Sequence, residues 1–239
     1  MGGEGCRRSA DFATALWTTP CPLSCLTVVQ SPTMHIRLIA HDLAASYGAR
    51  TVFSGVSLEI CQGEVLVVSG ANGSGKSTFL RLLAGLQGAT AGSVLYRYAD
   101  KDWLPRDACP LIGWVAPDLA LYRELTAREN LRFFAEVRRL HLSEADIDGL
   151  LEQLGLGGRG DDRLSAYSSG MAQRLRYAYA LIHRPPVLLL DEPTVTLDIR
   201  GAEVVDQVIA RQRRDGIVVV ATNDPRELRY ADLLLELGR

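Results

Sequence analysis

A glycine-rich octapeptide is the segment of the sequence best suited to hold phosphate groups. It runs from Gly70 to Ser77 and fits the pattern G-x-x-x-x-G-K-[ST]. In this pattern the glycines let backbone N–H groups converge on phosphate oxygens at the N-terminus of a helix. Lys76 is expected to bridge the β- and γ-phosphates of a nucleotide, and Ser77 is expected to ligate Mg²⁺.

A second apolar run ends in a pair of carboxylates. Asp191 and Glu192 directly follow Val187 to Leu190, four aliphatic residues without alternation, which fits a strand buried on both faces of a parallel sheet. Ligands bind such sheets at the carboxyl ends of their strands, so both carboxylates are expected near the phosphates. Asp191 suits the Mg²⁺ shell, and Glu192 is placed to polarise an attacking water. Without the phosphate loop upstream, the same pair would read as a helix cap.

The residues around the octapeptide supply the elements that must position it. Glu64 to Ser69 is short and rich in valine, which predicts a strand before the loop. Apolar residues then recur at helical spacing after it, at Phe79, Leu82, Leu83 and Leu86. An ordinary glycine turn before a helix is the alternative, and the agreement of motif and context favours the phosphate loop.

A third segment, "LSAYSSGMAQRLRYAYALIHRPP", lies between the octapeptide and the carboxylate pair. Ser168, Ser169 and Gly170 make a small, polar helix start, whose N-terminus is a second candidate anion site. Apolar residues then fall on one helical face, at Met171, Leu175, Ala178, Tyr179 and Ile182. On its own this segment would be read as a capped surface helix.

The third segment resembles the signature of ABC-type ATPases, usually written LSGGQ, with Tyr167 to Met171 at the matching positions. The resemblance extends over residues 35–239. It implies an α/β fold of the P-loop NTPase class, with a mostly parallel sheet core and an inserted helical subdomain. It also implies that the signature closes onto the γ-phosphate held by a second protomer, so that ATP joins a head-to-tail dimer with two composite sites.

The resemblance assigns roles to residues and implies ATP and Mg²⁺ as cofactors. Tyr47 matches the aromatic residue that stacks on adenine, although a half-buried strand tyrosine is the alternative. Asp198 ends a loop, "VTLD", that crosses the dimer interface in the family. The implied catalytic residues are Glu192, Lys76 and Asn223, and the implied metal ligands are Ser77 and Asp191. The implied nucleotide contacts are Tyr47, Gly70, Ala71, Asn72, Gly73, Ser74, Gly75, Lys76, Ser77, Thr78, Ser168, Ser169, Gly170 and Asp198.

Two positions depart from the family pattern. Pro117 stands where the family carries a glutamine that contacts Mg²⁺ and reports on the transmembrane partner, and the adjacent Asp118 is either a substitute or a solvated loop residue. Asn223, at the tip of the apolar run that begins at Ile217, stands where the family carries a histidine facing the γ-phosphate. Asparagine keeps a hydrogen-bond donor but has no ionisable ring, so we expect slow but real hydrolysis. An asparagine that only makes a turn is the alternative.

Composition limits the classes of partner. The chain has 26 basic and 28 acidic residues, a formal net charge of -2, and this balance predicts no nucleic acid partner. No run approaches the roughly 18 apolar residues that span a bilayer, so we expect a cytoplasmic protein, peripheral on the inner face of the membrane. The cysteines show no metal-ligand spacing and read as reduced thiols: Cys6, Cys21, Cys25, Cys61 and Cys109.

The chain is expected to form one ATPase domain over residues 34–239, with a core at 34–98 and 186–239 and a helical subdomain at about 99–185. Residues 1–33 lack periodicity and are expected to be a disordered extension or an overlong start. There is one phosphate loop and no internal repeat, so a second protomer, identical or paralogous, must complete the composite sites.

The expected function is that of the ATP-binding and ATP-hydrolysing subunit of an ABC transporter, powering export through a separate transmembrane permease. The sequence looks similar to small export ATPases, among them the haem export and cytochrome c maturation (CcmA-type) group. A soluble ABC ATPase, such as one in iron–sulfur cluster assembly, is the alternative, and the loss of the partner-sensing glutamine at Pro117 favours it. A third alternative is a regulatory module that only dimerises on ATP.

Overall fold

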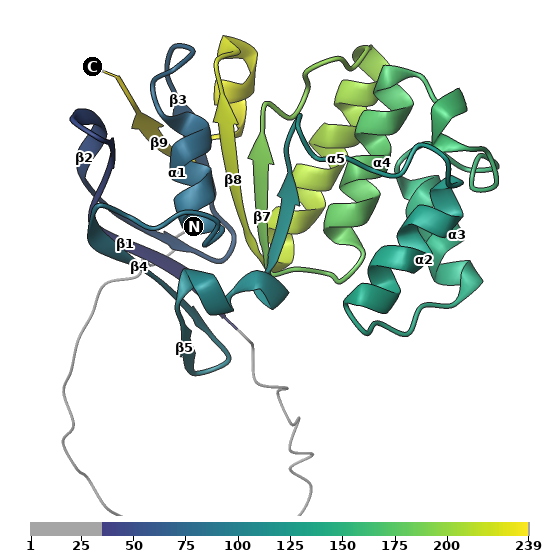
Figure 1. The fold of residues 1–239 in the computed structure, drawn as a ribbon, viewed down its shortest axis with the longest axis horizontal. Coiled ribbons are helices and arrows are strands. Elements are labelled where there is room, and N and C mark those ends of the chain that lie inside the picture. Colours follow the sequence, from purple (N-terminus) through teal and green to yellow (C-terminus); the bar gives the residue numbers. More distant parts are fainter. Residues whose placement is uncertain (1–34, 239) are drawn as a thin grey trace, which may run out of the picture. The chain divides into compact units, whose positions relative to one another are not determined.

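The computed structural model describes residues 35–238, which form two β-sheets and five α-helices (Figure 1). The expected extension at residues 1–33 lies outside the described residues. One sheet is parallel and the other is antiparallel. The described residues are therefore α/β in class, with a parallel sheet at the core.

The parallel sheet brings the ends of three strands together. Its order is β6 (Ile112–Val115), β7 (Val187–Asp191), β8 (Ile217–Thr222), β3 (Val65–Ser69) and β9 (Leu233–Glu236). In this register Ser69 of β3 lies beside Thr222 of β8, and Asp191 of β7 lies beside Ala221 of β8. The segments that leave β3, β7 and β8 therefore start from neighbouring points on the carboxyl edge of the sheet.

Both faces of this sheet are covered, which explains why its strands read as unbroken apolar runs. Alternate residues of a strand point to opposite faces. Accordingly Leu188 and Leu190 belong to one buried cluster, whereas Val187 and Leu189 belong to the other. The first cluster includes the helices α4 (Ser169–Leu181) and α5 (Ile199–Asp215), and the second includes α1 (Lys76–Leu83).

The antiparallel sheet packs against α1, and its buried residues join the same cluster as α1 and one face of the parallel sheet. Its strand order is β2 (Arg50–Cys61), β1 (Ile36–Tyr47), β4 (Ala91–Tyr98) and β5 (Lys101–Trp103). In β1 the buried residues alternate with more exposed ones from Ile36 onward, so one face of this sheet joins the core. Phe53 of β2 meets Phe79 of α1 edge to face, with ring centroids 5.8 Å apart.

The helices α2 (Ala127–Val137) and α3 (Glu144–Gln153) lie beyond α4 from the parallel sheet (Figure 1). Each begins with a capping box, Thr126 with Glu129 and Ser143 with Asp146. The stretch 99–185, expected as a helical subdomain, also contributes β5 and β6, and β6 pairs with β7 in the core sheet. The helical insertion therefore lies between β6 and β7.

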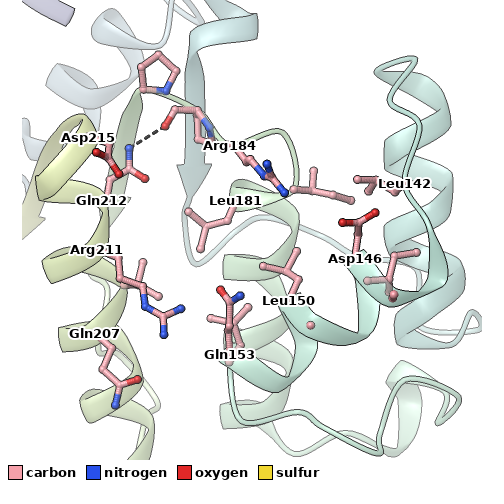
Figure 2. A pocket seen from close by; sticks show the side chains of 18 of the residues that line it. Leu142, Asp146, Leu150, Gln153, Leu181, Arg184, Gln207, Arg211, Gln212 and Asp215 are labelled. Carbon is pink, nitrogen blue, oxygen red and sulfur yellow. Dashed lines mark hydrogen bonds between the residues drawn. The ribbon is translucent and has the colours of Figure 1, made fainter. Parts of the chain in front are cut away.

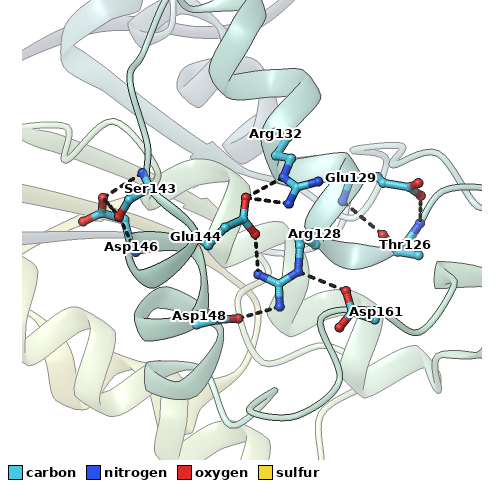
Figure 3. A network of polar contacts seen from close by, with 9 residues as sticks. All are labelled: Thr126, Arg128, Glu129, Arg132, Ser143, Glu144, Asp146, Asp148 and Asp161. Atoms are coloured by element: carbon cyan, nitrogen blue, oxygen red, sulfur yellow. Dashed lines mark hydrogen bonds and ion pairs between the residues drawn. The ribbon is translucent and has the colours of Figure 1, made fainter.

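Arg128 joins the two helices electrostatically. Its guanidinium contacts Glu144 and Asp148 of α3 at 2.9 and 2.7 Å, and Asp161 of the following loop at 3.0 Å (Figure 3). Arg132, one turn further along α2, contacts Glu144 as well. The insertion is thus held by a charged network on its surface in addition to its apolar core.

Candidate active site

The glycine-rich octapeptide leaves β3 and runs directly into α1. Gly75 adopts a left-handed conformation, with φ of 103°, and caps the helix. A Cβ atom at Gly75 would lie 2.3 Å from Cγ1 of Val52 in β2. A side chain at this position therefore has neither the backbone conformation nor the space that it needs. The helix runs from Lys76 to Leu83, so it begins three residues before Phe79 and ends three residues before Leu86, the first and last apolar positions of the predicted spacing.

The Lys76 ammonium group is buried inside the loop. The side chain is only 6% exposed, and Nζ donates hydrogen bonds to the carbonyl oxygens of Gly70 and Ala71 at 2.8 and 3.2 Å. Nζ also lies 3.9 Å from Oε1 of Glu192. A cation held in this way is available to phosphate oxygens that enter the mouth of the loop.

Asp191 is the last residue of β7, so it lies within the strand and not after it as the sequence predicted. Burial raises the pKa of its carboxyl group, while a hydrogen bond with the Ser77 side chain acts in the opposite direction. Its Oδ1 atom is buried and has no hydrogen-bond partner within residues 35–238. This oxygen and the Ser77 hydroxyl are hard donors of the kind that Mg²⁺ prefers.

Glu192 is held in an uncommon backbone conformation at the strand end. Its φ is 50°, and its backbone N–H donates to the Ala221 carbonyl at 2.9 Å. Burial raises the pKa of its carboxyl group, and the nearby Lys76 ammonium partly offsets that effect. A carboxylate with a raised pKa is a better proton acceptor than a fully solvated one.

Asn223 follows β8 and faces the phosphate loop. Its Nδ2 atom donates a hydrogen bond to Oδ1 of Asn72 at 2.8 Å. A backbone hydrogen bond from Asn223 also acts to lower the pKa of the Glu192 carboxyl group, against the larger effect of burial. The end of β8 is therefore linked to both the loop and the candidate base.

Tyr47 lies at the rim of the same hollow. Its side chain is 52% exposed, and its hydroxyl donates to Oε1 of Gln87 at 2.8 Å and lies 3.3 Å from Oγ1 of Thr78. The hollow measures about 460 Å³. Its lining is Tyr47, Arg50, Val52, Asn72, Gly73, Gly75, Lys76, Ser77, Thr78 and Glu192. Sequence reasoning missed Arg50, Val52 and Gln87, which carry no motif.

Seven predicted nucleotide contacts do not line this hollow. Three of them, Gly70, Ala71 and Ser74, belong to the phosphate loop itself, and the other four lie on other elements. Ser168 caps α4 by accepting a hydrogen bond from the Met171 N–H, and Ser169 and Gly170 form the first turn of that helix. Asp198 caps α5 by accepting from the Gly201 N–H at 2.7 Å. Within one chain, these residues have local capping roles.

The structure also locates Pro117, which departs from the family pattern, and its neighbour Asp118. Pro117 is exposed beyond the end of β6. Asp118 is 72% exposed, and its carboxylate lies 3.5 Å from Nη2 of Arg81 on α1. Asp118 therefore forms a surface ion pair in the described structure.

A larger hollow, of about 570 Å³, lies between α3, the end of α4 and α5 (Figure 2). Leu150 and Leu181 give it an apolar wall, and Arg211 extends toward it from α5. Gln212 crosses its upper end by donating to the Pro185 carbonyl at 2.7 Å. None of the predicted site residues lines it, so cavity size alone would point away from the phosphate loop.

Comparison with known proteins identifies the family. The sequence model of the ABC transporter family matches residues 53–195, which include the phosphate loop, the signature segment and both carboxylates. The chain belongs to the ABC transporter family. It is an ATP-binding, ATP-hydrolysing subunit of such a transport system.

Curated relatives of this ABC ATPase serve different transport systems. It is 35% identical over 182 residues to the lantibiotic transport ATP-binding protein SrtF of Streptococcus pyogenes, covering 76% of this chain and 77% of the relative. It is also 35% identical over 208 residues to the cytochrome c biogenesis ATP-binding export protein CcmA of Rhizobium etli, covering 85% and 95%.

A solved structure agrees with this assignment. The structure of an ATP-binding subunit of an ABC transporter matches with a TM-score of 0.73 and 26% identity, over 84% of this chain and 85% of that one. No helix within the described residues of the ABC ATPase is long and apolar enough to cross a membrane.

Proposed function

We propose that ATP hydrolysis in the hollow around Lys76 drives export through a separate transmembrane subunit. The observation that carries the proposal is the meeting of the phosphate loop, Asp191 and Glu192 at one edge of the parallel sheet. In the proposed reaction, water forms a bond to the γ-phosphorus while the bond from that phosphorus to the bridging oxygen breaks. Glu192 takes the proton from the water, and Lys76 and Asn223 donate hydrogen bonds to the phosphate oxygens.

Ser77 and Asp191 are the residues that we propose as metal ligands. The orphan Oδ1 atom of Asp191 and the adjacent Ser77 hydroxyl support this assignment. A bound Mg²⁺ ion would neutralise negative charge on the β- and γ-phosphates. Burial raises the pKa of Asp191, and a bound cation would lower it, because a cation favours the ionised carboxylate.

We further propose that two protomers pair so that Ser168 to Gly170 of one chain face the ATP of the other. Those residues are at an exposed helix start whose backbone N–H groups attract anions, and they do not reach the hollow of their own chain. Asp198, on the loop that follows Glu192, is proposed to lie at the same interface. The membrane association of the subunit follows from its proposed transmembrane partner.

For cargo, we propose the haem export and cytochrome c maturation group. The similarity to CcmA supports it, because that match extends over 95% of the relative. Equal identity to a lantibiotic transport protein makes a peptide exporter the competing assignment.

Three measurements test these proposals. In phosphate-release assays, Glu192→Gln should bind ATP but turn over at least about 10²-fold more slowly, whereas Lys76→Ala should lose ATP affinity. ATP-loaded Glu192→Gln protein, used as bait on detergent-solubilised native membranes, should recover a polytopic membrane protein, and Lys76→Ala bait is the control. Recovery of soluble cluster-assembly factors alone would contradict the transporter proposal.

The third measurement tests the cargo. Deletion of the gene should abolish c-type cytochromes, and normal levels of c-type cytochromes would contradict the proposed role in haem export and cytochrome c maturation.

A further inference from the structure

A buried carboxylate, Glu227, lies close to the candidate base. It belongs to η4 (Pro225–Tyr230), the turn of 3₁₀ helix that follows Asn223, and it is only 3% exposed. One of its oxygens, Oε2, is buried without a hydrogen-bond partner within the described residues. Burial of an incompletely paired carboxylate costs free energy, so an apolar side chain would serve a packing role better.

The other oxygen of Glu227 holds the loop that follows β7. Oε1 accepts hydrogen bonds from the backbone N–H and the hydroxyl of Thr194, at 3.3 and 2.5 Å. Thr194 is two residues after Glu192, so this contact joins the loop after β7 to the turn after β8. The buried hydroxyl of Tyr177 in α4 also contacts this loop, by donating to the Pro193 carbonyl oxygen at 2.9 Å.

The loop needs such support because two of its residues have left-handed backbones. Glu192 has φ of 50° and Thr196 has φ of 66°. This region is unfavourable for residues with a Cβ atom, and a residue stays there only where its surroundings fix it. A loop that relaxed from this conformation would carry the Glu192 carboxylate away from Lys76 and the phosphates.

We propose that Glu227 is a positioning residue, whose hydrogen bonds to Thr194 hold the loop after β7 so that Glu192 stays beside the phosphate loop. The inference rests on the proposed role of Glu192 in hydrolysis. Glu227 itself touches neither substrate nor reacting atoms. Through Thr194, it holds Glu192 at a fixed position relative to the turn that follows Asn223.

The test removes each half of the contact in full-length protein. Thr194→Val replaces the hydroxyl with a methyl group of similar size, and Glu227→Leu removes the acceptor. Each should lower kcat about 10- to 100-fold, because small misplacements of a catalytic group have effects of that size. KM for ATP should stay within about twofold, because the Lys76 contacts are untouched. The double variant should be no slower than the slower single one.

Conservative and matched variants separate positioning from folding. Thr194→Ser keeps the hydroxyl and Glu227→Gln keeps an acceptor oxygen, so both should retain most of the turnover. Tyr230→Phe is the matched control, because it removes a hydroxyl from the same turn that contacts Asp206 of α5 and not the loop after β7. Its kcat should not change. Melting temperatures of all variants should stay above the assay temperature.

The outcomes are distinct. Normal kcat in Thr194→Val or Glu227→Leu, with Glu192→Gln inactive, would overturn this inference alone. An equal loss in Tyr230→Phe would also overturn it, because the whole turn would then matter and not this contact. Normal turnover in Glu192→Gln would overturn the proposed role of Glu192, and this inference with it.

Discussion

The side-chain amide of Asn223 donates a hydrogen bond to Oδ1 of Asn72, across 2.8 Å and 151 positions of sequence. The contact joins the tip of β8 to the middle of the phosphate loop. It fixes the carboxamide of Asn223 against the phosphate loop. Because neither amide ionises, this link is the same at every physiological pH.

The first prediction concerns Asn223. Asn223→His should raise turnover several-fold at saturating ATP, because imidazole offers a donor that can also ionise. Asn223→Ala should lower turnover by about 10-fold or more, since it removes a positioned donor. Phosphate release measures both rates. Unchanged or slower hydrolysis by Asn223→His would show that this side chain does not act at the γ-phosphate.

The second prediction concerns Gly75. Gly75→Ala should abolish measurable ATP binding, because the new Cβ atom would lie 2.3 Å from Val52 Cγ1 and the backbone has φ of 103°. Gly73→Ala is the matched control in the same loop, since φ is 81° there but no atom lies within 4 Å of the added Cβ. It should bind ATP better than Gly75→Ala does. Equal affinities by fluorescent nucleotide titration would contradict the steric argument.

Local sequence was sufficient to place the phosphate loop and the carboxylate pair at one edge of the parallel sheet. The phosphate loop and the carboxylate pair each follow an unbroken apolar run, so their position at the sheet edge follows from the strands themselves. The errors there lie in the bounds of the elements and amount to one to three residues. Helix α1 starts at Lys76 because Gly75 already turns the chain, and β7 extends through Asp191 because that residue still pairs with Ala221.

Contacts between distant segments were not predictable. The hydrogen bond that Glu227 accepts from Thr194 depends on β7 and β8 being neighbours in the sheet, which no local pattern in "NDPREL" encodes. The sequence also did not predict that β6 belongs to the core sheet, because a strand of four residues carries little periodicity. Tertiary pairing decides such features, and a single sequence contains no direct record of it.

The third prediction concerns pH and His183. Burial lowers the pKa of His183 from 6.5 to about 4, and its Nε2 atom lies 3.1 Å from the Ile112 carbonyl oxygen. Between pH 6.5 and about 4 the unfolded chain binds a proton that the folded chain does not, so stability falls as pH falls. The partly exposed ring reduces the effect to about 1 kcal/mol between pH 7 and pH 5.

Urea denaturation at the two pH values checks this third prediction. His183→Gln should lose less stability than the unmodified protein over that range. His141→Gln is the control, because His141 is exposed on the helical insertion, and it should leave the pH dependence unchanged. Identical pH dependence in all three proteins would show that His183 does not contribute.

The fourth prediction concerns the charged network on the helical insertion. Arg128 is only 15% exposed and faces three carboxylates, so Arg128→Ala leaves those negative charges close together without a cation. Its melting temperature should fall by about 2–4 °C at low salt and by less at high salt, where repulsion is screened. Arg132 is half-exposed, and its ion-pair partner is Glu144. Arg132→Ala should therefore lower the melting temperature by less than half as much as Arg128→Ala does. Equal shifts in the two variants, or no dependence on salt, would indicate that Arg128 acts through packing and not through charge.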